Sequence, residues 1–238
     1  MTWLKKAILS ACVFILAGCV ESVTRADNPR ILLMGDSLMA IHGLSGNAVA
    51  DAMERHLGEP VIDRSVIGAR FIYPLPISGA AGLNITKQYR EGEWDWIVVN
   101  GGGNDILFGC GCGPCARKID RLISEDGRKG VIPGFIGRMR STGAKVIYVG
   151  YLRTPGTTSL VEFCVDEGRK MDERAARLAK LDDDVYFVAL SDLVPYGDFS
   201  FHALDTIHPS IKGSEAIGQR LANLIRDPKG FLASYKPN

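Results

Sequence analysis

A serine and a histidine that could act as nucleophile and base lie far apart in the sequence, each in a short polar segment. Ser37 directly follows an apolar run, and His208 lies three residues after Asp205. A serine hydroxyl becomes an effective nucleophile when an adjacent base takes its proton. Histidine suits that task, and a carboxylate can hold its tautomer and stabilise the imidazolium. These residue types therefore indicate acyl transfer through a serine.

Acyl transfer also requires hydrogen-bond donors directed at the oxyanion of the tetrahedral intermediate. We expect the backbone N–H groups of Ser37 and Gly68 and the side-chain amide of Asn104 to supply them. Glycine suits such a position because it allows close backbone approach and unusual dihedral angles. Asp36 and Asp105 are neighbours of these residues, and we expect them to brace the turns by hydrogen bonding rather than to react.

Each of these polar segments follows a predicted strand. Short apolar runs predict five strands, at residues 31–34, 61–67, 94–100, 145–151 and 185–190. Apolar residues at helical spacing predict helices at 47–57, 119–140 (interrupted around Gly130 and Pro133), 160–181 and 210–226. Strands that alternate with helices imply a parallel sheet with both faces covered. Ligands bind beyond the carboxyl ends of such strands, so we expect the polar segments to meet at that edge.

Four short motifs in this order resemble those of the SGNH hydrolases, also called GDSL esterases and lipases. They are GDSL at 35–38, an isolated glycine at 68, GGND at 102–105 and DxxH at 205–208. On this resemblance the conserved positions of the family fall on Ser37, Gly68, Asn104 and His208, and its acid falls on Asp205.

The resemblance also implies a fold and an activity. The implied fold is α/β, a flavodoxin-like three-layer sandwich with a five-stranded parallel sheet. The implied activity is serine ester hydrolysis through an acyl-enzyme, with no metal and no organic cofactor. The implied substrates are lysophospholipids and other short acyl esters, thioesters, or acetylated glycans. One departure from the family pattern is a cluster of cysteines directly after the asparagine motif.

Those cysteines are candidates for disulfides. Cys110, Cys112 and Cys115 lie within six residues, and Cys164 follows about fifty residues later. An even number of cysteines in an exported chain indicates disulfides, with several connectivities open. A metal site is the alternative, although zinc sites commonly use two separate CxxC pairs. We expect Cys164 to pair with one of the other three and to stiffen loops beside the site.

The N-terminal residues have the pattern of an export signal. Lys5 and Lys6 precede an apolar stretch at 7–19, which is typical of a secretory signal and short for a membrane-spanning helix of about 20 residues. Residues 16–19 (LAGC) resemble a bacterial lipobox, which predicts lipidation of Cys19 and a membrane anchor in the cell envelope. A cut after Ala26 is the alternative and would give a soluble secreted or periplasmic protein. Residues 1–26 then form the signal and linker, 27–229 the hydrolase domain and 230–238 a tail.

Composition narrows the remaining function classes. The chain has 238 residues with 28 basic and 27 acidic side chains, a balance that gives no reason to expect a nucleic-acid partner. Two alternatives stay open: a non-catalytic envelope binding module on the same fold, and a thiol or metal protein built on the cysteine cluster. His202 lacks the motif context of a catalytic base. His42 and Arg70 are weaker candidates for lining the site. No motif addresses the oligomeric state.

Overall fold

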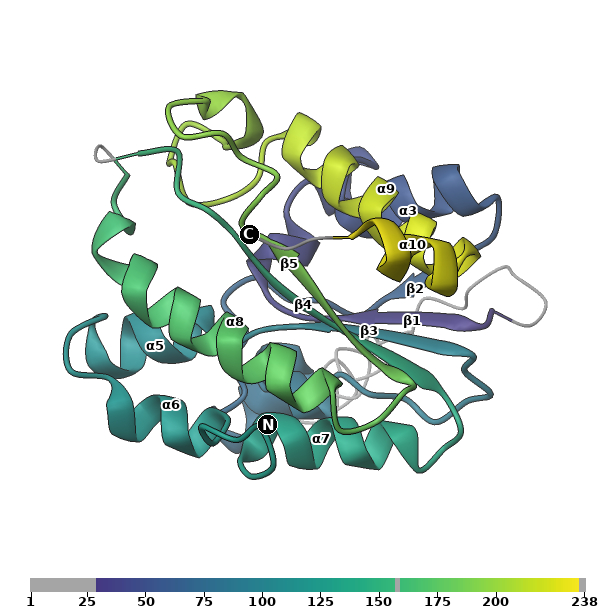
Figure 1. Ribbon diagram of the computed structural model, residues 1–238, viewed down its shortest axis with the longest axis horizontal. Coiled ribbons are helices and arrows are strands. Elements are labelled where there is room, and N and C mark those ends of the chain that lie inside the picture. Colours follow the sequence, from purple (N-terminus) through teal and green to yellow (C-terminus); the bar gives the residue numbers. More distant parts are fainter. Residues whose placement is uncertain (1–28, 157–158, 236–238) are drawn as a thin grey trace, which may run out of the picture.

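A five-stranded parallel sheet forms the centre of the protein, whose computed structural model describes residues 29–156 and 159–235 (Figure 1). The strands are ordered β2-β1-β3-β4-β5. Their bounds are β1 (Ile31–Met34), β2 (Val61–Asp63), β3 (Trp96–Asn100), β4 (Lys145–Leu152) and β5 (Val185–Leu190). This is the strand order of flavodoxin-like sheets, in which the order reverses between β1 and β3. The predicted α/β class and parallel sheet are confirmed.

Helices cover both faces of the sheet (Figure 1). One layer contains α3 (Val49–Leu57), α9 (Ile211–Arg226) and α10 (Pro228–Ser234). The other contains α5 (Gly103–Cys110), α6 (Ala116–Leu122), α7 (Val131–Arg140) and α8 (Val165–Ala179). Two short helices, α2 (Ser37–Ala40) and α4 (Pro76–Ser78), lie in the loops that follow β1 and β2. The result is a three-layer sandwich.

Alternation along each strand sends side chains into two separate cores. In β3, Ile97 and Val99 belong to the core under α7 and α8, whereas Trp96 and Val98 belong to the core under α3 and α9. Successive side chains of a strand point to opposite faces. A strand covered on both faces can therefore be apolar throughout, and all five residues of β3 are buried.

The observed elements are shorter than predicted at several boundaries. The second strand ends at Asp63 rather than residue 67, because the Asp63 carboxylate accepts a hydrogen bond from the Ser65 amide and starts a turn. The helix predicted at 160–181 begins only at Val165, after a 3₁₀ turn. The stretch 119–140 contains the end of α6 and the whole of α7. The two helices are separated before Val131 by Gly130, whose backbone φ is +123°.

The C-terminal region is more ordered than a tail. The helix α10 spans residues that the sequence divides between domain and tail, and Asp227 caps it by accepting a hydrogen bond from the Gly230 amide. Within the described ranges, no helix has both the length and the apolar character needed to cross a bilayer. The predicted export signal and the lipidation candidate Cys19 lie outside the described residues.

Candidate active site

Three side chains from two distant parts of the sequence form one hydrogen-bonded chain beyond the carboxyl ends of the strands. The Ser37 Oγ lies 2.9 Å from the Nε2 of His208. The Nδ1 of the same imidazole lies 2.6 Å from the Oδ2 of Asp205. One ring nitrogen therefore faces a hydroxyl and the other faces a carboxylate. This is the arrangement in which an imidazole can take a proton from a serine.

Ser37 is the first residue of α2, directly after the turn that ends β1. The Oδ1 of Asp36 accepts a hydrogen bond from the Leu38 amide at 3.0 Å, so Asp36 caps this helix. Gly35 is held on the other side by Gln88, whose side chain accepts from the Gly35 N–H and donates to its carbonyl. The serine is 8% exposed. The capped turn and the Gln88 side chain therefore fix the backbone that carries a nearly buried serine.

The loop between β5 and α9 positions the histidine. The Oδ1 of Asp205 accepts hydrogen bonds from the Ile207 and His208 amides, both at 3.0 Å. Its other oxygen faces the imidazole, so the carboxylate orders both the backbone and the ring. Ser159, in the loop after β4, donates to the Thr206 carbonyl at 3.0 Å. Two loops at the edge of the sheet are thus joined next to the candidate base.

Hydrogen bonding raises the stability of the ionised Asp205. Partial burial acts to raise the pKa of Asp205, but the hydrogen bonds from the His208 ring and from the two amides outweigh it. The pKa therefore lies below its ordinary value. A carboxylate that stays ionised is the form that can stabilise an imidazolium.

Two of the candidate oxyanion donors, Gly68 and Asn104, lie in the segments that follow β2 and β3. Gly68 has a backbone φ of +81°, a conformation that favours glycine, and its N–H donates to no described group. The Asn104 Nδ2 donates one hydrogen bond to the Ala69 carbonyl at 3.1 Å. This bond ties the asparagine to the segment that carries Gly68 and leaves its second amide hydrogen for a ligand.

Asp105 stabilises the segment that carries Gly68 through hydrogen bonds to its backbone. Its two carboxylate oxygens accept hydrogen bonds from the Phe71 and Ile72 amides at 2.9 and 2.8 Å. Burial raises the pKa of Asp105 above its ordinary value, against the opposing effect of these amides and of the Arg70 charge. The side chain is 2% exposed, so it can support the glycine segment but cannot contact a substrate.

Tyr151 connects the turn before Ser37 (the serine turn) to the turn before Asn104 (the asparagine turn). It was not among the residues predicted from the sequence. Its hydroxyl donates to the Oδ2 of Asp36 and accepts from the Gly103 N–H at 2.9 Å. Burial raises the pKa of Tyr151 well above 10, which keeps the phenol neutral. A side chain at Gly103 would place its Cβ 2.7 Å from the tyrosine ring. The position of Tyr151 near the end of a predicted strand was the signal that could have identified it.

The other candidates from the sequence form no hydrogen bond with the Ser37, His208 or Asp205 side chains in the described part of the chain. His202 is buried and burial lowers its pKa, but the imidazole that bonds to Ser37 and Asp205 is that of His208, so His202 is not placed as a second base. The His42 Nε2 lies 3.0 Å from the Pro209 carbonyl and supports the histidine loop. Arg70 lies over the rings of Tyr73 and Phe108, at 5.0 and 5.9 Å from their centroids.

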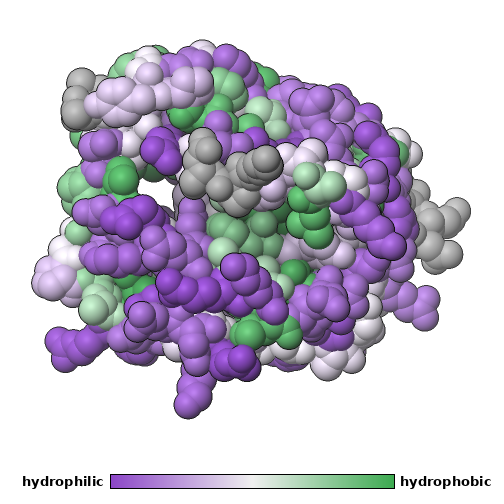
Figure 2. All heavy atoms as spheres, viewed as in Figure 1, coloured by the Kyte–Doolittle hydropathy of each residue, from purple (hydrophilic) through white to green (hydrophobic). Residues whose placement is uncertain are grey.

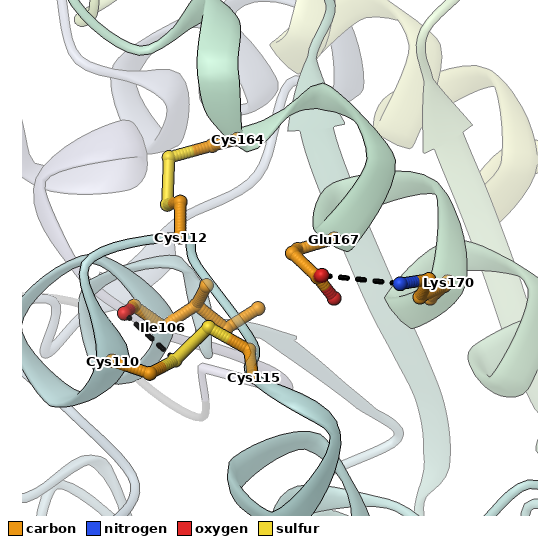
Figure 3. Close-up of a disulfide and its surroundings, with 7 residues drawn as sticks. All are labelled: Ile106, Cys110, Cys112, Cys115, Cys164, Glu167 and Lys170. Atoms are coloured by element: carbon orange, nitrogen blue, oxygen red, sulfur yellow. Dashed lines mark hydrogen bonds and ion pairs between the residues drawn. A yellow bond between two sulfur atoms is a disulfide. The ribbon is translucent and has the colours of Figure 1, made fainter.

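The four cysteines form two disulfides beside this edge (Figure 3). Cys110 pairs with Cys115 between the end of α5 and the start of α6, and Cys112 pairs with Cys164 just before α8. The second bond joins the loop after β3 to the loop after β4. It is one of the three pairings that the sequence left open for Cys164. None of the described residues forms a cluster of three or more metal-ligating side chains.

The space-filling view shows the surface hollowed on the left, the side on which the loops after β4 and β5 lie in the ribbon view (Figures 1 and 2). This side is also where the strands have their carboxyl ends (Figure 1). The fold, with a serine, an imidazole and a carboxylate in line at this edge, is that of an α/β ester hydrolase.

The sequence places the protein within a family of such enzymes. Residues 33–216 match the GDSL-like lipase/acylhydrolase family, and the chain belongs to that family. The protein is therefore a carboxylic ester hydrolase of the SGNH/GDSL superfamily. No curated protein sequence matches the chain.

Solved structures of low sequence identity share the fold. A protein assigned as an SGNH hydrolase from Slackia heliotrinireducens is 19% identical, with a TM-score of 0.57 over 84% of this chain and 100% of that one. A family two carbohydrate esterase from Clostridium thermocellum, in complex with cellohexaose, is 19% identical with a TM-score of 0.58 over 87% and 67%. A carbohydrate acetylesterase from Sinorhizobium meliloti is 17% identical with a TM-score of 0.53 over 83% and 99%.

Proposed function

We propose that the protein hydrolyses carboxylic esters with Ser37 as nucleophile, His208 as general base and Asp205 as the acid that orients the base. The observation that carries this proposal is the continuous hydrogen-bonded chain from the Ser37 Oγ through both imidazole nitrogens to the Asp205 carboxylate. Such a chain is needed because serine is a weak nucleophile until an adjacent base can take its proton.

In the first step, the Ser37 Oγ attacks the carbonyl carbon of the ester while its proton moves to the Nε2 of His208. The negative charge that develops on the carbonyl oxygen is stabilised by the N–H groups of Ser37 and Gly68 and by the Asn104 amide. The imidazolium then protonates the alcohol oxygen as the C–O bond breaks. The alcohol leaves, and the acyl group stays on Ser37.

In the second step, water releases the acyl group. His208, neutral again, takes a proton from a water molecule that attacks the acyl carbon. The same donors stabilise the second oxyanion, and the imidazolium returns the proton to the Ser37 oxygen as the acyl bond breaks. The products are a carboxylic acid, the alcohol and the regenerated enzyme.

Several substrate classes fit this chemistry. The family includes lipases and acylhydrolases, and two of the solved structures with this fold are named as carbohydrate esterases. Acetylated glycans, lysophospholipids or short acyl esters, and thioesters are therefore the candidates. We place the reaction in the cell envelope or outside the cell, which the predicted export signal and the two disulfides support.

The test is hydrolysis of short and long p-nitrophenyl esters together with labelling by a fluorophosphonate. The Ser37→Ala variant should lose labelling and at least 10⁴-fold in kcat. Ser45→Ala is a matched control, since Ser45 is an exposed serine in the same connection between β1 and α3 and should remain fully active. Labelling of Ser37→Ala at the wild-type rate would overturn the assignment of the nucleophile.

The same experiment addresses the alternatives. A folded protein that neither turns over esters nor reacts with the fluorophosphonate would favour a non-catalytic binding module. A thiol or metal function is not favoured, because each of the four cysteines among the described residues is already paired in a disulfide.

A further inference from the structure

Exposed apolar side chains of the described residues gather on the side of the candidate active site. All but two of the large ones lie in segments that follow the carboxyl end of a strand, the exceptions being Leu181 and Leu232. The turns at the opposite edge are short and polar, as in residues 58–60, 141–144 and 181–184. Contiguous exposed apolar surface marks sites of interaction with proteins, membranes or ligands.

The strongest part of this surface borders Gly68 and Asn104, and we call it the basic rim. It consists of Ile67, Arg70, Tyr73, Leu75, Ile77, Phe108 and Lys118. Ile77 is 88% exposed, Phe108 66%, Leu75 59% and Ile67 58%.

Contacts within the basic rim hold two loops together. The Arg70 guanidinium lies over the rings of Tyr73 and Phe108, which joins the segment after β2 to helix α5. The Tyr73 hydroxyl lies 3.1 Å from the Ser78 Oγ and closes the turn that carries the two aliphatic tips. The side chain of Lys118 lies against Gly109, next to Phe108. Arg70 and Lys118 thus lie beside the aromatic side chains, next to the turn that carries Leu75 and Ile77.

The charge of this surface has one sign. The sequence contains no acidic residue between Asp63 and Glu91, and none between Asp105 and Asp120. Asp105 itself is buried and directs both oxygens to backbone amides. Arg70 and Lys118 form no ion pair with any other residue that the structure describes. A surface of exposed aliphatic tips with unpaired cations is complementary to an anionic surface with an apolar interior.

We propose that the basic rim docks on an anionic lipid bilayer and presents Ser37 to acyl esters in that surface. Ile77, Leu75 and Phe108 would enter the boundary between headgroups and acyl chains, while Arg70 and Lys118 would meet the anionic headgroups. A saccharide is a poorer fit, because the tips are branched aliphatic groups without hydrogen-bonding atoms and Arg70 already covers one face of each of the Tyr73 and Phe108 rings. The inference deepens the proposed function and rests on it only for the role of Ser37.

The test is binding to vesicles, measured by co-sedimentation with the chain from residue 27 onward, which contains every described element but lacks the predicted anchor. The unaltered protein should bind vesicles of phosphatidylcholine mixed with phosphatidylglycerol at least tenfold more tightly than vesicles of phosphatidylcholine alone. The Ile77→Ser/Phe108→Ser double variant should lose at least tenfold in binding to the mixed vesicles. Lys118→Glu should lose binding to the mixed vesicles only.

Two controls make the result specific. Leu181→Ser/Leu232→Ser also replaces two exposed apolar residues by serine, away from the basic rim, and should bind like the unaltered protein. Ser37→Ala should bind vesicles normally, so that failure of docking and failure of the proposed catalysis are separate results. If a double variant is unstable, Ile77→Ser alone serves, because an 88% exposed side chain contributes little to the core.

Three outcomes would overturn the proposal. One is absence of vesicle binding by the unaltered protein. Another is equal loss of binding in the rim variant and in the Leu181/Leu232 control. The third is a dimer in size-exclusion chromatography that the rim variant abolishes, which would assign the surface to a second copy of the chain.

Discussion

The two halves of the candidate site differ in how deeply their carboxylates are buried, although each carboxylate accepts hydrogen bonds from backbone amides. On the β1–β3 side, Asp36 and Asp105 are buried, and their carboxylates accept hydrogen bonds from the backbone. On the side of the β5–α9 loop, the Asp205 side chain is 42% exposed and faces an imidazole. Burial raises the pKa of Asp36 to about 6, whereas the hydrogen bonds to Asp205 hold its pKa below the ordinary value.

Asp36 and Asp105 bond to turns of the backbone, whereas Asp205 also bonds to the candidate base. A buried carboxylate that serves backbone amides fixes a turn, and it does so at a cost in free energy when it is ionised. A half-exposed carboxylate bonded to a histidine costs little to ionise and can stabilise an imidazolium. We therefore expect these three aspartates to have two different roles, and substitutions can test the difference.

The largest expected effect comes from Asp205→Asn. The new amide oxygen can still accept the Ile207 and His208 N–H bonds, but the imidazole loses its anionic partner. We expect kcat for p-nitrophenyl acetate to fall roughly 10³- to 10⁴-fold, while the free energy of unfolding in urea changes by less than about 1 kcal/mol. If Asp205→Asn lost much stability but little kcat, Asp205 would support the structure of its loop and would not assist the base.

The next effect concerns the disulfides that support the loops around the site. Cys112–Cys164 closes a loop with a sequence separation of 52, and Cys110–Cys115 one of 5. In the chain-entropy description these bonds contribute about 4 and about 2 kcal/mol to stability. We expect Cys112→Ala/Cys164→Ala to lower the unfolding free energy by more than Cys110→Ala/Cys115→Ala does in urea denaturation. Equal losses of unfolding free energy in the two double variants would show that the length of the closed loop does not set the contribution of each disulfide.

The pH dependence of stability should distinguish Asp36 from Asp205. Because the pKa of Asp36 rises from 3.8 to about 6 on folding, the folded protein holds a proton that the unfolded chain has lost. The unfolding free energy therefore falls as pH rises from about 4 to about 6, by about 3 kcal/mol for this group. Asp36→Asn removes that slope, which urea denaturation across this pH range would measure.

Asp205 should act in the opposite direction. Its pKa is lowered on folding, so its contribution to stability is present above the unfolded pKa and is lost as pH falls through the folded value. The unaltered protein should therefore lose part of its unfolding free energy as the pH falls, and Asp205→Asn should lack that part of the loss. If Asp36→Asn and Asp205→Asn changed the pH dependence of the unfolding free energy in the same direction, the difference in burial would not determine the pKa values of the two carboxylates.

The sequence predicts the sheet and the polar segments at its edge because these features are local. Apolar runs define the strands, and the motif around Ser37 and the one around His208 are readable without coordinates. The roles of Gln88 and Tyr151 could not be read in this way, because each bonds to residues more than 45 positions away. The end of β2 at Asp63 was missed because a side chain-to-backbone turn outweighed the β-propensity of Val66 and Ile67.

The smallest effect that we predict tests the connection within the buried half. Tyr151→Phe removes the hydroxyl that donates to Asp36 and accepts from the Gly103 amide. The partly buried Gly103 N–H loses its acceptor, so we expect the unfolding free energy to fall by about 1–3 kcal/mol. The pKa of Asp36 should rise further, because its hydrogen bond from Tyr151 is one of the effects that lower it.

A double-mutant cycle makes this test specific. Tyr151→Phe and Asp36→Asn remove the same hydrogen bond, so their effects on the unfolding free energy should not add. Tyr148→Phe is the control: Tyr148 is the other tyrosine of β4, but it is buried and its hydroxyl donates to the Gly101 carbonyl instead. Its effect should add to that of Asp36→Asn within about 0.5 kcal/mol. If the effects of Tyr151→Phe and Asp36→Asn on the unfolding free energy also added, the turn before Ser37 and the turn before Asn104 would be stabilised independently of each other.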